Sequence, residues 1–277
     1  MEFNLPKRIE NSNKSTYGRV LNIAGSDYMP GAAYLSSVSA LKIGCGYCFL
    51  CSSERVIDAV SAQTQNVVFV PQNKVGEYIA NADVIEIGCG LGTNTIAQKM
   101  FSKLLDNAYT RTPIVMDADA LNILSQNEYD QLYDFTNKKF KNLVFTPHPK
   151  EAAGLLNVTT DKVLENIELS AKEITRKFNC VTVLKTHKTF ICAPNGREYF
   201  NKTGNNAMAK AGSGDVLTGI IAGLIAQGMD IFEAACLGCH LHGMSGDIAK
   251  EKLTEYSVMA EDLISFIPEA LKFYLSK

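Results

Sequence analysis

The sequence predicts an α/β protein with a doubly wound, mostly parallel sheet, helices on both faces and one domain spanning residues 1–277. Short runs rich in Val, Ile, Leu and Phe alternate with stretches whose apolar residues recur every three or four positions. Hydrophobic residues make up 46% of the chain, which is enough for a full core. No linker, charge block or internal repeat marks a domain boundary.

Short apolar runs bounded by turn residues predict the strands. Residues 1–18 are polar and lead into the first run. The predicted strands cover residues 19–24, 47–51, 66–70, 83–87, 113–116, 142–145, 181–185, 189–193 and 198–200. The last two strands flank the sequence Pro-Asn-Gly-Arg at residues 194–197, which is typical of a hairpin.

Helical spacing predicts the helices between and after these strands. The predicted helices cover residues 30–43, 54–62, 75–80, 96–105, 161–178 and 216–225, and two more begin at Asp230 and after Ser257. Pro30 suits the first turn of its helix. Asp230 and Glu233 have the spacing of a capping box.

Composition excludes several classes of function. The net charge is −2 and the isoelectric point is about 6.1, so nothing indicates a nucleic-acid or membrane-surface partner. The first fifteen residues lack the apolar stretch of a signal peptide, and no apolar run is long enough to span a bilayer. These features predict a cytoplasmic protein.

Eight cysteines raise the question of a metal site. Cys48 and Cys51 lie in a strand-like run, and Cys236 and Cys239 form a C-x-x-C pair in a helix-like run. A structural zinc site needs four ligands on tight turns, whereas these settings are typical of core residues. We therefore interpret the cysteines as reduced, buried thiols.

Polar and Gly-rich clusters follow five of the predicted strands. They are Gly25-Ser26-Asp27, Gly88 to Gly92, Asp117 with Asp119 and Asn122, His148 with Glu151, and Lys185. In an open α/β sheet, ligands bind outside the carboxyl ends of the strands. The five clusters are therefore expected to lie at one edge of the sheet and to form a site there.

A second feature, the polar loop at residues 204–215, runs directly into the helix at 216–225. Free N–H groups and the positive end of the helix dipole suit an anion at such a point. Asp215 lies where the helix begins, so it is either an N-cap or a catalytic carboxylate.

Each cluster also has a purely structural interpretation. Gly88 to Gly92 matches a dinucleotide fingerprint only loosely and is equally typical of a tight turn. His148 lies between two prolines, in a loop that either presents it to a site or leaves it on the surface. The remaining candidates are Asp117 and Asp119 as turn or cap residues, Lys185 as a solvated lysine, and His240 and His242 as packing or surface groups.

Taken in order, these motifs resemble the ADP/ATP-dependent NAD(P)H-hydrate dehydratases, a family of the ribokinase-like superfold. The resemblance runs from Lys14 to about Ile267, which leaves residues 1–13 as a polar lead-in. Its motifs are Lys14-Ser-Thr-Tyr-Gly, Ala24-Gly-Ser-Asp-Tyr-Met-Pro-Gly-Ala-Ala, Gly88-Cys-Gly-Leu-Gly, Asp117-Ala-Asp-Ala-Leu, Thr146-Pro-His-Pro-Lys-Glu, Lys185-Thr-His-Lys-Thr, residues 204–215, and Leu241-His-Gly with Gly246-Asp.

The resemblance implies repair of NADH or NADPH that has been hydrated on the nicotinamide ring, in its S epimer. ADP or ATP phosphorylates the hydrate hydroxyl, and elimination of phosphate restores the reduced cofactor. It also implies Mg²⁺, a homo-oligomer that is often a tetramer, and an epimerase, which in a chain of this length is expected to be a separate protein.

By the same resemblance, Asp215 is the catalytic base and the N–H groups of Gly212, Ser213 and Gly214 hold the transferred phosphoryl group. The implied substrate-binding residues are Ala32, Gly90, His148 and Asp215. The implied nucleotide-binding residues are Lys185, Thr186, His187, Lys188, Thr189, Gly212, Ser213 and Gly214. Glu151 matches an acidic position that organises Mg²⁺ through water.

The sequence departs from the family pattern at three places. Cys89 stands where Pro is common, Thr186 where Gly is common, and Ser213 where Thr is common. Thr186 is the departure that bears on the donor site, because it adds a β-branched side chain where the backbone would pass close to a nucleotide.

Two alternatives stay open at this point. A ribokinase-like small-molecule kinase acting on a thiazole or pyrimidine alcohol would share the Gly-x-Gly-Asp ending. A catalytically inactive nucleotide-binding scaffold would share the fold, but an intact loop with Asp215 argues against it.

Overall fold

One nine-stranded sheet organises the computed structural model, which describes residues 3–107, 112–126, 129, 132–135 and 140–276. The strand order is β3-β2-β1-β4-β5-β6-β7-β8-β9. The strands are β1 (Arg19–Ile23), β2 (Tyr47–Ser52), β3 (Val68–Pro71), β4 (Val84–Ile87), β5 (Ile114–Met116), β6 (Leu143–Phe145), β7 (Val181–Leu184), β8 (Phe190–Cys192) and β9 (Glu198–Phe200). All neighbouring pairs from β3 to β7 are parallel, and β8 and β9 are antiparallel. The predicted mostly parallel sheet is confirmed.

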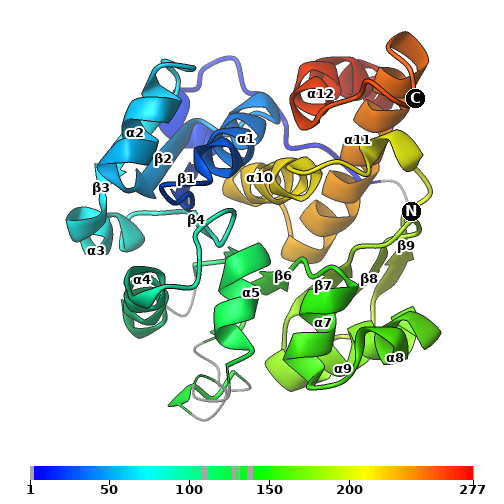
Figure 1. Ribbon diagram of the computed structural model, residues 1–277. Helices are drawn as coiled ribbons and strands as arrows, with labels where there is room; N and C mark the ends of the chain where they lie inside the picture. The colour runs from blue at the N-terminus through cyan, green and yellow to red at the C-terminus, as the bar shows by residue number, and fades with distance from the viewer. Residues whose placement is uncertain (1–2, 108–111, 127–128, 130–131, 136–139, 277) are drawn as a thin grey trace.

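Helices cover both faces of the sheet, as predicted for a doubly wound fold (Figure 1). One layer holds α1 (Pro30–Lys42), α2 (Glu54–Ser61), α10 (Ser213–Ala226), α11 (Ile231–Lys252) and α12 (Ala260–Leu275). The other holds α3 (Val75–Ile79), α4 (Thr95–Asn107), α5 (Ala118–Leu124), α7 (Pro149–Leu156), α8 (Thr160–Glu165) and α9 (Ile167–Phe178). Asp230 caps α11 by accepting from two backbone N–H groups, so its predicted start is confirmed.

Successive strand residues face opposite layers, because side chains alternate along a strand. In β1, Val20 belongs to the core that contains α10 and α11, whereas Leu21 belongs to the core that contains α4 and α9. Both residues are fully buried. A polar residue in the same register as Val20 therefore faces α1 and α10.

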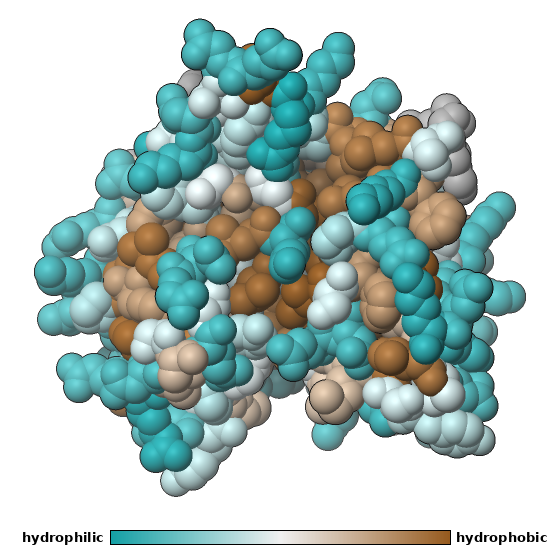
Figure 2. Space-filling view, turned by 90° about the horizontal axis from the view of Figure 1, so that it is seen from above, coloured by the Kyte–Doolittle hydropathy of each residue, from teal (hydrophilic) through white to brown (hydrophobic). Residues whose placement is uncertain are grey.

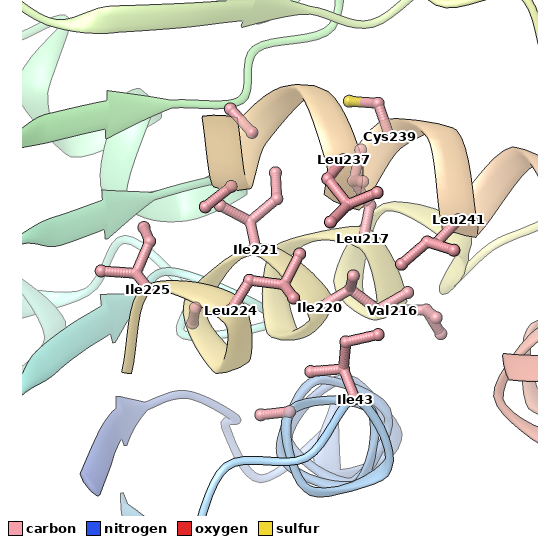
Figure 3. Close-up of a cluster of buried hydrophobic side chains, with 14 of the residues drawn as sticks. Ile43, Val216, Leu217, Ile220, Ile221, Leu224, Ile225, Leu237, Cys239 and Leu241 are labelled. Carbon is pink, nitrogen blue, oxygen red and sulfur yellow. The ribbon is translucent and has the colours of Figure 1, made fainter. Parts of the chain in front are cut away.

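The central helix of the first layer is α10, which is apolar on all sides. Figure 3 shows it between α1 and α11, with Ile220 and Val216 toward Ile43 of the α1 side and Leu237 from α11 on the opposite side. Gly219 allows the close approach of α1, because a Cβ there would overlap the Ser36 carbonyl oxygen. The helix is therefore fixed by packing rather than by surface contacts.

One prediction about the helices is wrong. The sequence predicts a single helix over residues 161–178, but the chain forms α8 and α9 with a break at Asn166. Asn166 has φ −149° and ψ 87°, and its side chain accepts a hydrogen bond from the Leu169 N–H. An apolar stripe continues across the break, so the spacing alone could not reveal it.

The segment before β1 packs against the domain. Phe3 is 8% exposed, and its ring meets the Tyr199 ring edge-on at 5.5 Å between centroids. Its backbone also exchanges hydrogen bonds with the Tyr274 hydroxyl of α12. A short 3-10 helix, η1 (Lys14–Tyr17), capped by Asn13, then leads into β1.

All eight cysteines are unpaired and buried, which confirms their interpretation as core residues. Burial raises the pKa of every one of these thiols. Among the described helices, none has both the length and the apolar character needed to cross a bilayer. On the face seen from above in Figure 2, apolar side chains gather across the middle, between hydrophilic side chains at the margins.

We expect Gly219→Ala to lower the free energy of unfolding by about 1–3 kcal/mol, because the new methyl group meets backbone of α1 that cannot move aside. Gly31→Ala in α1 is the matched control: no atom lies within 4 Å of the added Cβ, so it should be neutral or slightly stabilising. Urea unfolding of both variants measures the difference. Equal stability of the two variants would contradict the close α1–α10 packing.

Candidate active site

The polar clusters that follow the strands lie at one edge of the sheet, where the parallel strands end. Neighbouring turns are joined by hydrogen bonds: the Gly25 N–H donates to Cys89 O at 2.8 Å, and the Lys185 N–H donates to Pro147 O at 2.8 Å. Asp119 accepts from the Gly92 N–H at 2.7 Å. The turns after β1, β4, β5, β6 and β7 therefore form one continuous rim.

Asp117 connects three elements of this rim. Its side chain accepts from Lys185 Nζ at 2.6 Å and from Thr218 Oγ1 at 2.7 Å, so β5, β7 and α10 meet on one carboxylate. Asp117 is 1% exposed and the Lys185 side chain 19%. Burial lowers the pKa of Lys185, but the carboxylates of Asp117 and Glu151 outweigh it and the net pKa is raised. The lysine therefore stays charged.

Asp215 lies in the first turn of α10, not at its cap. The N-cap is Gly212 in the left-handed conformation, with φ 90°, and a Cβ there would come within 2.5 Å of Leu35 Cδ1. The interpretation of Asp215 as the N-cap is therefore wrong. Burial first, and then the Asp117 charge, raise the pKa of Asp215 to about 6, against the lowering contacts of Cys89 and Lys185.

The first turn of α10 offers an anion site beside this carboxylate. The Val216 N–H donates to Gly212 O at 3.1 Å, so the N–H groups of Gly214 and Asp215 precede the first full helical turn, where the helix has no internal acceptor. A Cβ on Gly214 would lie 3.4 Å from Lys185 Nζ. Backbone donors, the helix dipole and an ammonium group thus converge on one point.

Ser213 in this loop is held by a neutral histidine. Its hydroxyl lies 3.4 Å from His242 Nε2 of α11. Burial lowers the pKa of His242 to about 4, so at neutral pH the ring carries no charge. His242 therefore supports the loop as a packing group, without adding a cation to the anion site.

His148 is the N-cap of α7, in a capping box with Glu151. Its Nδ1 accepts from the N–H groups of Lys150 and Glu151 at 3.2 Å each, which leaves Nε2 as the donor toward Glu151 Oε1 at 3.2 Å. Glu151 is 6% exposed, and burial raises its pKa to about 7 although Lys185 opposes the shift. Burial, then Lys185, lowers the pKa of His148. Half of its ring stays accessible at the rim.

Ala32 and Gly90 lie against each other at the other end of the rim. Gly90 has φ 61°, and a Cβ there would be 2.7 Å from Ala32 Cβ and 3.0 Å from Met29 Cβ. A cavity of about 380 Å³ opens beside this contact, lined by residues 25–29 after β1, by Ser53 and Gln72, and by Leu91, Gly92, Asn94, Ile96 and Ala97. Its volume lies within the range of small-molecule sites.

Of the predicted nucleotide-binding residues, the turn between β7 and β8 is bonded mainly to itself. Thr186 Oγ1 donates to Lys188 O at 2.9 Å and accepts from the Lys188 N–H at 3.2 Å. Thr189 Oγ1 donates to Thr186 O at 3.3 Å, and His187 and Lys188 are exposed. Thr186 thus stabilises the turn, and only Lys185 of this set reaches the α10 loop.

Sequence reasoning missed two partners in the site. Thr218 comes three residues after Asp215 and so lies on the same side of α10, a spacing that could have revealed it. Glu86 stands alone as a charged residue in the otherwise apolar strand β4, and the Cys89 thiol lies 3.6 Å from its Oε1. A charged residue within a predicted buried strand could have identified Glu86 as part of the site.

The strand order of the sheet and the polar rim at its edge are those of a protein with a ribokinase-like fold. A ribokinase-like protein from Enterococcus faecalis has the same fold, with a TM-score of 0.87, 27% identity, and coverage of 98% of this chain and 92% of that one. A family model described as NAD(P)H-hydrate dehydratase matches residues 20–269. The chain therefore belongs to the NAD(P)H-hydrate dehydratase family, as predicted.

Curated relatives agree with this assignment. An ADP-dependent (S)-NAD(P)H-hydrate dehydratase from Neisseria meningitidis is 38% identical over 245 residues, covering 88% of this chain and 81% of the relative. A bifunctional NAD(P)H-hydrate repair enzyme from Moorella thermoacetica is 38% identical over 282 residues, and the chain spans 52% of its length. The ADP/ATP-dependent dehydratase from Bacillus subtilis, co-crystallised with ATP and Mg²⁺, matches with a TM-score of 0.85 and 30% identity over 98% of this chain and 94% of that one.

We expect Lys185→Met to lower the free energy of unfolding by about 3 kcal/mol, because it leaves the Asp117 carboxylate buried without its charged partner. Lys252→Met removes an exposed ion pair with Glu269 and is the control, with an expected loss of about 0–1 kcal/mol. Denaturant unfolding at pH 7 compares them. A loss no larger than that of the control would show that Asp117 does not depend on Lys185.

Proposed function

We propose that this chain dehydrates the S epimer of hydrated NADH or NADPH, using ADP or ATP as phosphoryl donor. Family membership supports the reaction class. The observation that carries the mechanism is the position of Asp215, a half-buried carboxylate in the same helical turn as the N–H groups of the anion site. A base and a phosphoryl site are thus side by side.

In this mechanism, the hydrate hydroxyl attacks the terminal phosphorus of the nucleotide as Asp215 takes its proton. The bond to the leaving nucleotide breaks, giving AMP from ADP or ADP from ATP. The Gly214 and Asp215 N–H groups and Lys185 stabilise the charge on the transferred phosphoryl group. Phosphate then leaves the ring, and the reduced nicotinamide is restored.

The raised pKa of Asp215, about 6, suits this role. At pH 7 the carboxylate is mostly ionised, yet it is more basic than an exposed aspartate. Ala32, Gly90 and His148 are proposed to contact the hydrated dinucleotide, with the cavity beside Gly90 as part of its site. The turn after Lys185 is proposed to contact the adenine nucleotide.

The residues present fit Mg²⁺ held mainly by phosphate oxygens and water. Asp117, Asp119, Asp215 and Glu151 lie around Lys185 at the rim, so a further cation would balance their charge. Among the described residues, no group of three or more ligating side chains forms a cage. Glu151 would hold the ion through water, and the ion would neutralise phosphate charge.

The oligomeric state of the protein, its functional partner and its cellular location are proposed as well. We propose a homo-oligomer and a functional partnership with an epimerase, in line with relatives named as bifunctional repair enzymes. Eight unpaired cysteines support a reducing compartment such as the cytoplasm.

The small-molecule kinase alternative has weaker support. A hydroxyethylthiazole kinase from Pyrococcus horikoshii shares the fold with a TM-score of 0.66, but at 14% identity this likeness shows the fold alone. An inactive scaffold would not need a carboxylate with a raised pKa beside an anion site.

The deciding assay mixes the protein with NADH hydrate, Mg²⁺ and either ADP or ATP. We expect the absorbance of reduced nicotinamide to recover with at least one nucleotide, with release of phosphate. Parallel assays with a thiazole alcohol and a pyrimidine alcohol test the kinase alternative. Recovery with neither nucleotide would overturn the proposed function.

We expect Asp215→Asn to lower kcat by about 10²–10⁴-fold while the affinity for ADP and ATP stays near that of the wild type. Asp161→Asn in α8, an exposed aspartate, is the control and should keep full activity. Steady-state kinetics and calorimetric binding measure the two effects. Near-normal turnover of Asp215→Asn would exclude a role as base.

A further inference from the structure

One side of α11 carries a motif that the mechanism above does not use. His242, Gly243, Gly246 and Asp247 recur three to four positions apart, so they lie on the same side of the helix. α11 lies beside α10 (Figure 1), and this side of it contacts the loop at residues 203–213 that leads into α10. The loop ends at the proposed anion site, so the contacts that fix the loop also bear on that site.

The two glycines of this motif let the loop lie directly on α11. A Cβ on Gly243 would overlap the side chain and the carbonyl carbon of Thr203, and a Cβ on Gly246 would overlap the Met208 side chain. Thr203 Oγ1 also donates to His240 O at 2.8 Å, which ties the start of the loop to the helix backbone. Because part of the obstacle at Gly243 is backbone, a side chain there would push the loop away from the helix.

Asp247 holds the beginning of the loop with both carboxylate oxygens. Its Oδ2 accepts from the Gly204 N–H at 3.0 Å, and its Oδ1 accepts from Asn205 Nδ2 at 2.8 Å. Asn205 Oδ1 in turn accepts from the Ala207 N–H at 2.9 Å and caps the short 3-10 helix η4 (Asn206–Met208). One carboxylate therefore fixes both the backbone that enters the loop and the residue that begins η4.

Backbone hydrogen bonds connect this point to the anion site. The Met208 N–H donates to Asn205 O at 3.2 Å, the Lys210 N–H donates to Met208 O at 2.8 Å, and the Ser213 N–H donates to Lys210 O at 3.3 Å. Ser213 begins α10 and directly precedes Gly214. The loop is therefore a series of bonded turns, and a displacement at Asn205 would reach the N–H groups of the anion site.

We propose that Asp247 is a positioning residue for phosphoryl transfer. It sets the loop on α11 so that the N–H groups of Gly214 and Asp215 are held in place for the terminal phosphoryl group of the donor nucleotide. Asp247 acts through Asn205 and the loop rather than by contact with the nucleotide. The inference rests on the proposed anion site at the start of α10, and it gives the Gly-Asp motif of α11 a role in that site.

Charge and position predict opposite effects of removing this carboxylate. Asp247 is exposed and acidic, so the loss of its charge alone would favour an anionic ligand. The loss of its hydrogen bonds instead frees the loop, and donors that must be ordered on binding give a weaker affinity. A weaker affinity for the terminal phosphoryl group would therefore report the position of the loop and not the charge of Asp247.

The first test compares ADP and ATP, which carry the phosphoryl group to be transferred, with AMP, which lacks it. Calorimetric titration of the full chain in Mg²⁺ measures the Kd of each nucleotide. In Asp247→Ala, the Kd of whichever of ADP and ATP binds the wild type more tightly should rise about tenfold, whereas the Kd of AMP should stay within about twofold. Glu251→Ala, which removes an exposed carboxylate one turn further along α11, is the control and should weaken neither.

The second test asks whether Asp247 acts through Asn205. Asn205→Ala carries no change of charge and should weaken binding of the donor nucleotide without weakening that of AMP. The double variant of Asn205→Ala and Asp247→Ala should lose clearly less affinity than the product of the two single effects, because both changes interrupt the same series of contacts. Fully additive losses would contradict a route through Asn205.

The outcomes separate this inference from the proposed function. Unchanged or tighter binding of the donor nucleotide in Asp247→Ala would overturn the inference, and so would an equal loss of affinity for AMP, which is what a general loss of structure would give. A wild type that binds ADP and ATP no more tightly than AMP would overturn the anion site and the role of Asp247 together. Because the titrations need no turnover, a wild type that fails to restore hydrated NADH would overturn the proposed function and leave these results to decide the role of Asp247.

Discussion

The buried carboxylate of Asp117 is the constraint on which the active edge depends. A charge in the core must be compensated, and Asp117 is compensated by Lys185 from β7 and Thr218 from α10. These contacts hold the start of α10 over the ends of the strands. Gly219 allows α10 to lie close enough to α1 for that position to be reached. The anion site and Asp215 follow from where this helix starts.

The carboxyl groups of Asp215 and Glu86 have different pKa values, because each has different neighbours. Asp117 has an ammonium partner at 2.6 Å, whereas Asp215 has a thiol and a more distant lysine, and its pKa is about 6. Glu86 has only neutral partners and other carboxylates, and its pKa is about 8. Environment thus separates a base from a neutral acid.

The sequence predicted most of the fold, because each buried strand is a short apolar run and the turns after the strands carry the polar groups. It could not predict the break at Asn166, where the apolar stripe continues, or the cap at Gly212, which depends on a left-handed backbone. Sequence spacing placed Asp117 and Lys185 at one edge of the sheet, but it could not show that the Lys185 and Thr218 side chains, 68 and 101 residues away, both bond to Asp117. The break at Asn166, the cap at Gly212 and the partners of Asp117 all depend on tertiary packing.

The eight buried thiols can report local unfolding of the native protein, because a thiol becomes accessible to reagents only when its surroundings open. The cysteines are buried and their raised pKa values leave little thiolate at neutral pH, so alkylating reagents meet no reactive thiol on the folded surface. Cys48 and Cys51 lie in β2, next to the edge strand β3, and Cys236 and Cys239 lie in α11. The order in which a thiol reagent labels them would give the order in which these parts of the native protein open, without any introduced probe.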